Sequence, residues 1–455
     1  MSETEVDVVV LGAGPAGEVA AGRLGERDLE VVIVEDRLIG GECSYWACMP
    51  SKALLRPPQA LDETRRIPGA AEAAAGTPDV GAALRRRDEV IHDLDDAAQL
   101  PWLEERGIGL LRGRGRITGE REVTVGEHVV RARRAVVVAV GTMPLVPPIP
   151  GLGEADPWTN REATTSKQVP ASMVVLGGGP VGCELSQAYA RFGSEVTLVE
   201  KKDCLLGREE GFAARELRDG LREAGVTVHD GTSANEVRRD GDAWVVATDI
   251  AGDLRCERIL VASGRRHVTG DLGLESVGLD PDDGPLEVDD RMRVAGLDWL
   301  YAIGDVNGRQ LLTHMGKHQG RIAADVICGR DASVRDDGPP PRVVFTEPQV
   351  ASVGYTLAAA QEAGLNVRAA DVPTQGTAGA SFYGKGTGGT SRIVVDEDRR
   401  MIVGATFVGI DVAEWLHAAT IAVVGKVPVD DLWHAVPAFP SRSEVWLKLL
   451  EAYGN

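Results

Sequence analysis

The chain has 455 residues, of which 43% are hydrophobic and 26% charged, a globular composition long enough for about three domains. Its net charge of −20 argues against a nucleic-acid partner, because no surplus of Lys and Arg is available to neutralise phosphates. No apolar run approaches the roughly 18 residues of a transmembrane helix, and acids precede the first short apolar run, so we expect a cytoplasmic protein without a secretory signal.

The first 35 residues carry a dinucleotide-binding pattern. A buried strand over residues 7–11 leads into a loop containing Gly12, Gly14 and Gly17, which opens a helix, and a second strand over residues 30–34 ends at Glu35. Such glycines let the backbone approach a pyrophosphate at a helix N-terminus, and the acid accepts ribose hydroxyls. A glycine-rich structural turn is the alternative, but both flanking strands and an acid 18 residues after Gly17 favour a nucleotide.

Two cysteines, Cys43 and Cys48, follow in the stretch over residues 40–52, GGECSYWACMPSK. Five steps along an ideal helix separate two Cα atoms by about 7.5 Å, beyond the roughly 7 Å that a disulfide spans. A bond between them therefore needs a distorted first turn, which Gly40 and Gly41 can supply. A helix starting here would favour thiolate over thiol and indicates redox chemistry, the alternative being chance spacing in a reduced protein.

The next hundred residues are less informative. A charged region to about residue 105 contains a predicted helix over residues 82–94 and is interpreted as a solvated face. Short strands are predicted within residues 107–118 and over residues 123–130, and a buried strand over residues 135–140 ends at Gly141-Thr142 before a proline-rich linker.

A second unit then repeats the first. A strand over residues 173–176, a loop with Gly177, Gly179 and Gly182, a helix over residues 184–192 and a strand over residues 195–199 lead to Glu200, again 18 residues after the third glycine. Two such units imply two dinucleotides, of which a hydride-donating nicotinamide and a flavin are the natural pair.

The acid that closes this second unit bears on nucleotide choice. Glu200 would accept a ribose 2′-hydroxyl and repel a 2′-phosphate, which favours NADH over NADPH. Lys201 and Lys202 leave NADPH open, because they either neutralise a phosphate or are surface residues.

The remaining third of the chain changes character near residue 339. A strand over residues 258–262 ends at Ser263-Gly264, a strand from residue 300 ends at Gly304-Asp305, and a helix opens at Thr313-His314-Met315. Beyond residue 339 we predict antiparallel strands over 343–346, 350–355, 392–396 and 402–408, and helices near 357–363, 413–424 and 444–451.

These pieces, in this order, resemble the pyridine nucleotide–disulfide oxidoreductases of the glutathione reductase, lipoamide dehydrogenase and mercuric reductase type. The likeness covers essentially the whole chain and rests on the two dinucleotide units, the CxxxxC, the YAIGDV strand and the segment VVFTEPQVASVG. It implies an α/β fold with two Rossmann-like domains and a C-terminal α+β dimerisation domain. The implied boundaries are FAD-binding at 1–150 and 269–337, NAD(P)-binding at 151–268, and dimerisation at 338–455.

The resemblance also implies residue roles. Cys48 would lie against the flavin as the charge-transfer thiolate, Cys43 would be the interchange thiol, and Lys52 would sit near the flavin and pair with Glu184. Glu35 would hold the adenosine ribose and Asp305 the ribityl chain. The expected cofactor-binding residues are Gly12, Gly14, Gly17, Glu35, Gly41, Lys52, Gly115, Thr142, Gly304, Asp305 and Met315, with Gly177, Gly179, Gly182, Glu200 and Gly264 in the second unit.

One departure concerns the family's C-terminal His-Pro-Thr-x-x-Glu segment, whose histidine serves the partner subunit as acid/base. Here Phe439 stands at that position, while the glutamate survives as Glu444. Phe carries no proton, and a positioned acid/base is worth about 10²–10⁴-fold. Ordinary dithiol catalysis should be impaired, unless His434, His417 or His314 takes over; a lone helical histidine is more often a surface or core residue.

Related families give partial precedents for this departure. Mercuric reductases lack the histidine too but end in a cysteine pair, and no cysteine follows Cys328, so mercury is not expected and no metal site is predicted. The ketopropyl-coenzyme M carboxylases resemble this chain in having Phe there, where it excludes protons. A second departure is Tyr45-Trp46 between the cysteines, which either line a substrate pocket or pack beneath the flavin.

The resulting hypothesis is an FAD-dependent NAD(P)H oxidoreductase, active as a homodimer with a shared site, that reduces a disulfide or another small electrophile through Cys43 and Cys48. A flavin-only NAD(P)H:acceptor oxidoreductase of the quinone type and a proton-excluding, carboxylase-like reaction are the rivals within enzymes. A non-catalytic flavin-binding protein is the rival outside them, although such a protein would need neither both dinucleotide units nor both cysteines.

Overall fold

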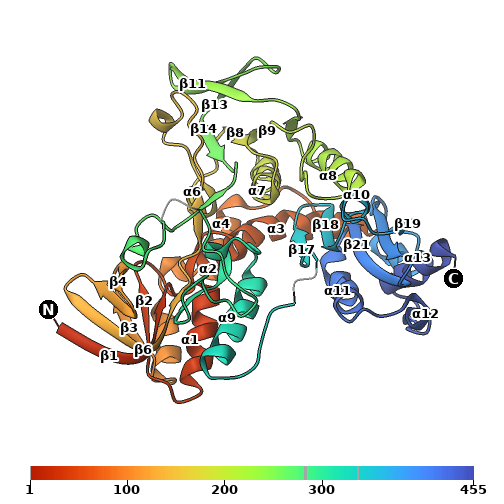
Figure 1. Cartoon of the computed structure of the whole chain (residues 1–455). Helices are drawn as coiled ribbons and strands as arrows, with labels where there is room; N and C mark the ends of the chain where they lie inside the picture. Colours follow the sequence, from red (N-terminus) through yellow and green to blue (C-terminus); the bar gives the residue numbers. More distant parts are fainter. Residues whose placement is uncertain (1, 281–283, 336–337, 455) are drawn as a thin grey trace. The chain divides into compact units, whose positions relative to one another are not determined.

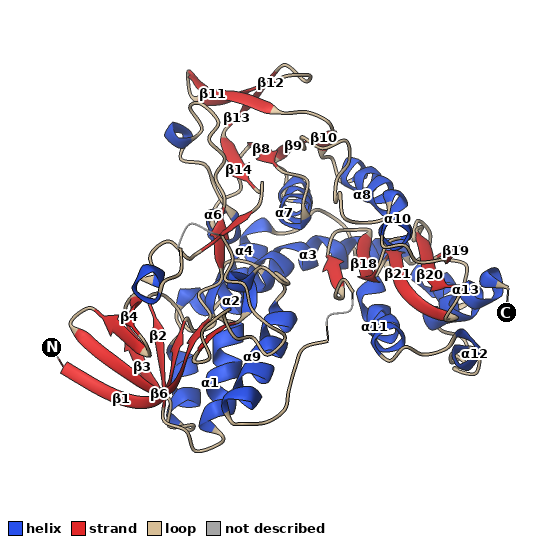
Figure 2. Ribbon diagram, viewed as in Figure 1, coloured by secondary structure: helices blue, strands red, loops and turns tan. Residues whose placement is uncertain are grey.

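The computed structural model describes residues 2–280, 284–335 and 338–454 and shows the mixture of helices and strands that the sequence predicts (Figures 1 and 2). It divides into two compact units. The first contains Met1–Pro50, Arg87–Leu145 and Arg265–Asp336, and the second contains Ser51–Arg86, Val146–Gly264 and Asp337–Asn455. The domain boundaries expected from the family stay a prediction, and the one at residue 337 lies outside the described residues.

A seven-stranded sheet organises the first unit. Its strands are β1 (Ser2–Leu11), β2 (Val31–Glu35), β3 (Gly109–Arg112), β4 (Gly115–Gly119), β5 (Glu122–Val125), β6 (His128–Val138) and β16 (Leu300–Ala302). They are ordered β3-β2-β1-β6-β5-β4, and β16 pairs with the C-terminal part of β6. The pairs among β3, β2, β1, β6 and β16 are parallel, whereas β5 and β4 continue as an antiparallel hairpin.

The central strand β2 is buried along its whole length, as expected of a parallel sheet that helices cover. On one face α1 (Pro15–Gly25) and α9 (Thr313–Ile327) lie side by side (Figure 1). The same unit holds α2 (Gly41–Tyr45), α5 (Leu100–Glu104) and a short ladder between β7 (Thr142–Pro144) and β15 (Arg265–His267). Helices α3 (Cys48–Arg66) and α4 (Val80–Val90) each contain a boundary between the units.

The second unit contains the repeated nucleotide-binding motif. Parallel strands β8 (Ser172–Leu176), β9 (Glu195–Val199), β10 (Thr227–His229) and β14 (Arg258–Val261) form a sheet ordered β10-β9-β8-β14. Its helices are α6 (Asn160–Thr165), α7 (Pro180–Arg191) and α8 (Gly211–Glu223). A separate antiparallel sheet lies between β10 and β14 in the sequence. It consists of β11 (Ala234–Asp240), β12 (Ala243–Thr248) and β13 (Asp253–Cys256) and was not predicted.

The last part of the second unit is an antiparallel α+β layer. Strands β17 (Arg342–Val344), β18 (Gln349–Gly354), β19 (Val367–Pro373), β20 (Thr390–Asp396) and β21 (Met401–Gly409) are ordered β17-β18-β21-β20-β19. Helices α10 (Leu357–Glu362), α11 (Leu416–Val424), α12 (Val429–Leu432) and α13 (Val445–Tyr453) accompany them, and Phe407 packs edge-on against Trp415 and Trp446. The predicted fold class is confirmed, although β19 was not predicted.

Two predicted strand boundaries are wrong. Residues 123–130 do not form one strand, because the chain turns at Gly126 with a φ of +59°, a conformation that suits glycine, and divides into β5 and β6. Residues 135–140 do not form a separate strand, because β6 runs from His128 to Val138 without a break. Periodicity finds buried segments but misses a turn that falls inside an apolar run.

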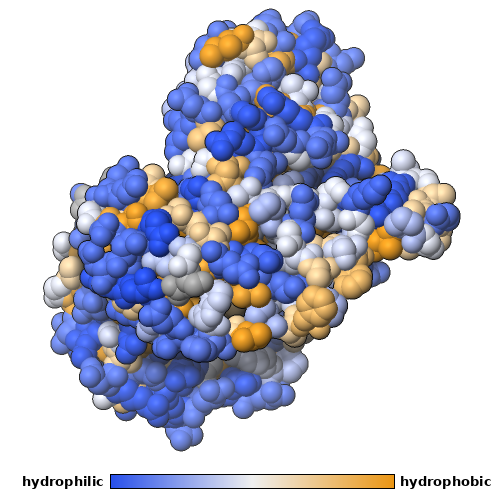
Figure 3. Space-filling model, turned by 90° about the vertical axis from the view of Figure 1, so that its right-hand side faces the viewer, coloured by the Kyte–Doolittle hydropathy of each residue, from blue (hydrophilic) through white to orange (hydrophobic). Residues whose placement is uncertain are grey.

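The surface is mostly hydrophilic with scattered apolar patches on the face drawn in Figure 3, in keeping with the net charge of −20. Among the described residues, no helix is both long and apolar enough to cross a membrane.

Candidate active site

The glycine loop between β1 and α1 has the backbone that a dinucleotide requires. Gly12 has a φ of +103°, and a Cβ there would lie 2.5 Å from the Ala139 carbonyl oxygen. A Cβ on Gly17 would lie 2.0 Å from the Gly12 oxygen, so only glycine lets the helix pack onto the loop. Gly14 differs, because no heavy atom lies within 4 Å of its ideal Cβ position. The open space thus lies at the N-terminus of α1, where backbone amides favour a phosphate.

The loop between β8 and α7 repeats this geometry. Gly177 has a φ of +118°, and its Cβ would lie 2.5 Å from the Ala262 oxygen. A Cβ on Gly182 would lie 1.8 Å from the Gly177 oxygen, while Gly179 again faces open space. Both loops therefore fit the pyrophosphate of a dinucleotide, one in each unit.

The acids predicted to bind ribose lie directly at these loops. Glu35 accepts hydrogen bonds from the amides of Ala13 at 2.7 Å and Arg37 at 2.8 Å. Glu200 accepts corresponding bonds from Gly178 at 2.6 Å and Lys202 at 2.8 Å. Burial raises the pKa of Glu35, and the two backbone bonds oppose that rise.

The cysteine segment consists of two helices, not one. Gly40 (φ +109°) and Gly41 (φ +59°) make the predicted distorted entry, and a Cβ on Gly41 would lie 2.8 Å from the Gly14 Cα. Helix α2 ends at Tyr45, and α3 begins anew at Cys48 after a non-helical Trp46 with a φ of −133°. This break lets residues five apart approach each other, and it places the cysteine segment against the first glycine loop.

Both sulfurs converge on one hydroxyl. Thr313, the first residue of α9, donates a hydrogen bond to Cys43 Sγ at 3.1 Å, and its Oγ1 lies 3.6 Å from Cys48 Sγ. The pKa of the Cys43 thiol lies well above its ordinary value, first because of its hydrogen bond with Cys48 and then because of burial. Cys43 lies inside the five-residue α2, whereas Cys48 is the first residue of α3, so the expectation that a helix N-terminus favours a thiolate stays a prediction.

Lys52 and Glu184 form the ion pair that the resemblance implies. Lys52 Nζ lies 2.7 Å from Glu184 Oε2 and 4.7 Å from the centre of the Phe345 ring. The other oxygen of Glu184 accepts the Phe345 amide at 2.9 Å, and the Glu184 side chain is buried. Lys52 is four residues after Cys48 in α3, so both residues lie on one face of that helix.

The other predicted cofactor residues of the first unit form two groups. Thr142 donates to Asp305 at 2.8 Å and accepts from Arg265 at 2.7 Å, and burial raises the pKa of Asp305. Gly304 (φ +75°) lies against Ala16, where a Cβ would approach the Ala16 Cβ to 3.2 Å. Met315 is half-buried in the first turn of α9, and Gly115 lies against the ends of β1 and β2, near Leu11 and Val34. In the second unit, Gly264 (φ +135°) faces open space.

The segment that carries Phe439 and Glu444 is turned outward in the single chain. The Phe439 side chain is 78% exposed, and Trp433 and Val436 are exposed beside it in the sequence. Glu444 accepts the Gly379 amide at 3.3 Å instead of orienting an imidazole. His314, His417 and His434 are all exposed.

Three functional candidates were missing from the sequence analysis: Thr313 as a partner of the sulfurs, Lys317 one turn later in α9, and Glu18 in the first turn of α1. No local pattern could have singled them out, because Thr313 reaches the sulfurs, and Lys317 comes near Glu18, only when α9 packs on α1.

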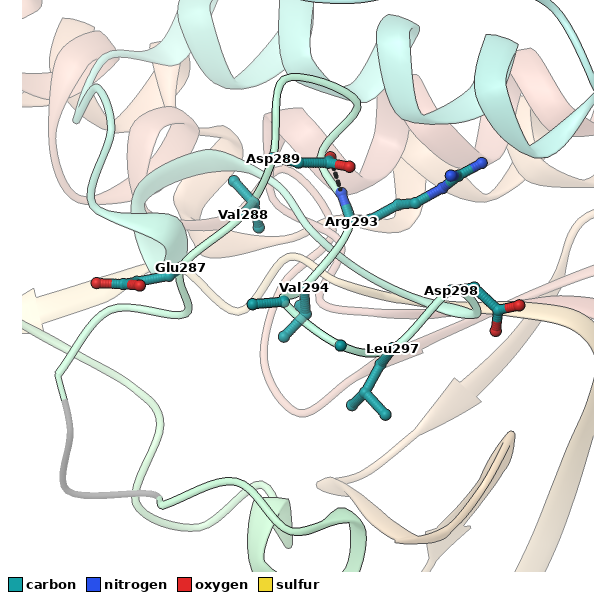
Figure 4. A pocket seen from close by; sticks show the side chains of 9 residues that line it. Glu287, Val288, Asp289, Arg293, Val294, Leu297 and Asp298 are labelled. Atoms are coloured by element: carbon teal, nitrogen blue, oxygen red, sulfur yellow. Dashed lines mark hydrogen bonds between the residues drawn. The ribbon is translucent and has the colours of Figure 1, made fainter.

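A cavity of about 490 Å³ lies in the loop from Glu287 to Asp298, where the Arg293 amide donates to Asp289 at 2.9 Å (Figure 4). None of the predicted site residues lines it. Within the described ranges, no three His, Cys, Asp or Glu side chains are grouped so as to hold a metal ion.

Comparison with known proteins identifies relatives along the whole chain. Residues 6–320 match the model of the pyridine nucleotide-disulphide oxidoreductases, and residues 340–450 match the dimerisation domain of the same group. The chain is 33% identical over 455 residues to a dihydrolipoyl dehydrogenase of Thermus scotoductus, covering 98% of this chain and 97% of the relative. It is 32% identical over 448 residues to a mercuric reductase of Shigella flexneri, covering 95% and 78%.

A solved structure shares the same architecture. The HOCl-induced flavoprotein disulfide reductase RclA from Escherichia coli, solved as a Cu(II) complex, superimposes with a TM-score of 0.88 at 25% identity, over 98% of this chain and 99% of the other.

Proposed function

Because the chain belongs to the pyridine nucleotide-disulphide oxidoreductase family, whose members use FAD and NAD(P)H, we propose that it reduces a small disulfide or another electrophile through Cys43 and Cys48 without a histidine acid/base. The observation that carries the proposal is the convergence of both sulfurs on Thr313 beside the first glycine loop. We further infer a homodimer, because residues 340–450 match the dimerisation domain. A cytoplasmic location stays the expectation from the sequence.

The residues present fit both nucleotides. In the first unit Gly12, Gly14 and Gly17 would hold the FAD pyrophosphate, Glu35 the adenosine ribose and Asp305 the ribityl chain, with Gly41, Gly115, Thr142, Gly304 and Met315 lining the same unit. In the second unit Gly177, Gly179, Gly182, Glu200 and Gly264 would hold NAD(P)H, with NADH preferred. When bound, FAD supplies two-electron transfer between the nicotinamide and the Cys43–Cys48 disulfide.

The remaining chemistry belongs to the two sulfurs. The reduced Cys43 sulfur attacks one sulfur of the substrate disulfide, forming a mixed disulfide and releasing the first half as a thiolate. Cys48 then attacks Cys43, which re-forms the Cys43–Cys48 bond and releases the second thiolate. The two electrons from one NAD(P)H account for both released thiolates. Lys52, held by Glu184, keeps a positive charge on the face of α3 that carries Cys48.

The absence of a proton donor at Phe439 restricts the disulfide substrates that can react quickly. A Phe brings no proton to the leaving sulfur, so substrates whose thiolates are stable unprotonated should react fastest. This property favours low-pKa aromatic disulfides over alkyl disulfides such as lipoamide. A Phe439→His variant should increase turnover of alkyl disulfides by about 10-fold or more and leave aromatic disulfides nearly unchanged. Equal rates on both substrate types before and after the substitution would count against this assignment.

The central experiment replaces each cysteine in the holoenzyme. Cys43→Ser should keep NADH-dependent flavin reduction and the long-wavelength absorbance expected of a Cys48 thiolate beside the flavin, yet lose disulfide turnover. Cys48→Ser should lose both the band and the turnover. The exposed Cys204, changed to Ser, is the matched control and should leave all three properties intact. Full disulfide turnover by Cys43→Ser would show that the reaction does not proceed through the Cys43 thiol.

The rival is a flavin-only NAD(P)H:acceptor reaction in which neither sulfur participates. In that case quinone reduction by Cys43→Ser and Cys48→Ser would equal that of the unchanged protein, and no disulfide would be turned over by any variant.

A further inference from the structure

The N-terminal turns of α9 bring a cation toward the cysteines. Thr313, which contacts both sulfurs, is the first residue of this 15-residue helix, and Lys317 follows four residues later. Residues four apart lie on the same face of a helix, one turn from each other. Long helical side chains also lean toward the N-terminus of their helix, so the Lys317 side chain is directed toward Thr313 and the sulfurs.

Close packing fixes α9 against α1. A Cβ on Gly320 would lie 2.7 Å from the Ala16 carbonyl oxygen, and a Cβ on Gly316 would lie 3.3 Å from the Ala16 Cβ. The two backbones therefore touch beside Lys317, whose own side chain is half-buried. A helix held in this way cannot rotate without a clash, so the direction of Lys317 is set by the fold.

The electrostatics of the neighbouring groups agree with this placement. Lys317 lowers the pKa of the Cys43 thiol and that of the Glu18 carboxyl in α1. Burial nevertheless raises the pKa of Glu18 to about 7, with a smaller contribution from Glu35. Cys48 raises the pKa of the Cys43 thiol, and Glu42, which precedes Cys43, lies 3.6 Å from Arg265.

Cys43 needs such support, because its neighbour Cys48 and its burial both oppose the thiolate. The groups that favour the thiolate are the Thr313 hydroxyl, through its hydrogen bond, and the Lys317 ammonium, through its charge. Both belong to the same subunit as Cys43, whereas position 439, turned outward on the single chain, carries a phenyl ring without charge.

We propose that Lys317, together with Thr313, holds the Cys43 sulfur as a thiolate from within its own subunit, and that this arrangement serves in place of a charged histidine at position 439. Lys317 is a positioning residue in this scheme: it acts on the electrostatics of Cys43 and does not touch the substrate. The inference rests on the proposed function, in which Cys43 is the attacking sulfur.

The test measures the thiol directly. The anaerobic, NADH-reduced holoenzyme is treated with iodoacetamide between pH 6 and pH 10, and the alkylation rate of Cys43 is followed by peptide mass mapping. Lys317→Met should shift the midpoint of the pH profile upward by about one unit, which is a roughly tenfold slower alkylation below the midpoint. Lys317→Arg, which keeps the charge, should restore most of the profile.

Two further variants keep the test decisive. Thr313→Val removes the hydrogen bond alone and should shift the midpoint in the same direction. The exposed Lys385, changed to Met, loses a distant charge and should leave the profile unchanged. If Lys317→Met lacks FAD, Lys317→Gln takes its place. Profiles for Lys317→Met or Lys317→Gln that superimpose on that of the unchanged protein would overturn the inference.

The same samples separate this inference from the proposed function. A long-wavelength band on reduction and loss of disulfide turnover after Cys43 alkylation test the proposed function and do not depend on Lys317. If both are observed while the Lys317 variants keep the original profile, only the inference fails. If neither is observed in the unchanged protein, the proposed function itself fails.

Discussion

The two glycine loops of this chain have nearly the same backbone but different surroundings. In each loop the first glycine has a positive φ, the second faces open space and the third touches the first. Glu35 and Glu200 then close their loops through the same pair of amide bonds. The difference lies in the segment that packs on each loop.

In the first unit that segment carries the cysteines. The Gly40 amide donates to the Ala13 carbonyl at 2.8 Å, and Gly41 lies against Gly14. In the second unit the Leu206 amide donates to the Gly178 carbonyl at 3.0 Å, and the cysteine of that segment, Cys204, is exposed. The chemistry of each duplicated loop therefore depends on the segment that packs on it. The first loop suits a tightly bound cofactor next to the sulfurs, and the second suits a nucleotide that binds and dissociates.

The largest effects are expected when a side chain blocks one glycine loop at a time, which tests whether the two loops bind different nucleotides. Gly17→Val and Gly182→Val each place side-chain atoms where even a Cβ lies 2.0 Å or less from a carbonyl oxygen. Gly17→Val should yield protein without FAD. Gly182→Val should retain FAD but reduce it with NADH about 100-fold more slowly, while dithionite reduces it normally. A normal NADH rate in Gly182→Val would remove the nucleotide from this loop.

A gentler pair of substitutions separates binding from folding. No heavy atom lies within 4 Å of the ideal Cβ of Gly14 or Gly179, so Ala at either position should leave the melting temperature almost unchanged. The added methyl group nonetheless fills the space proposed for a pyrophosphate. We expect about tenfold weaker FAD binding in Gly14→Ala and about a tenfold higher KM for NADH in Gly179→Ala. The same effect on both cofactors in either variant would contradict separate sites.

Nucleotide choice should depend on the acid of the second loop. Glu200→Gln removes the negative charge opposite a 2′-phosphate but keeps an acceptor for the Gly178 amide. The ratio of KM values for NADPH and NADH should fall about three- to tenfold. Glu195→Gln, at the exposed start of the same strand, is the control and should not change this ratio. An unchanged ratio in Glu200→Gln would shift attention to Lys201 and Lys202.

The smallest effect concerns stability beside the first loop. Burial raises the pKa of Glu18 from 4.5 to about 7 in the folded protein, so folding favours the protonated carboxyl. Its contribution to stability is fully present below pH 4.5 and is lost as the pH rises to about 7. Glu18→Gln should therefore raise the free energy of unfolding by about 1–3 kcal/mol at pH 8, measured by denaturant unfolding, and leave it nearly unchanged at pH 4.

Glu223→Gln, in an exposed position on α8, is the control for that experiment and should show no pH-dependent difference. A Glu18→Gln gain of equal size at pH 4 and pH 8 would mean that the carboxyl does not titrate in this range.

Local sequence allowed both glycine loops, both acids and the cysteine pair to be predicted, because each depends on residues within about 35 positions. The Lys52–Glu184 pair was implied only by family resemblance, and the structure confirms the contact. Strands β11, β12 and β13 were not predicted, because alternation is weak there: β11 is exposed along most of its length.

The sequence alone determined that this chain binds two dinucleotides and places two cysteines beside the first, since glycine conformation and residue spacing are local properties. The tertiary structure alone decided which groups control those cysteines. Thr313 lies 270 residues after Cys43 and reaches it, with Lys317 one turn further along α9, because small residues let α9 pack directly on α1. Such long-range contacts arise from packing between helices, and no local pattern records them.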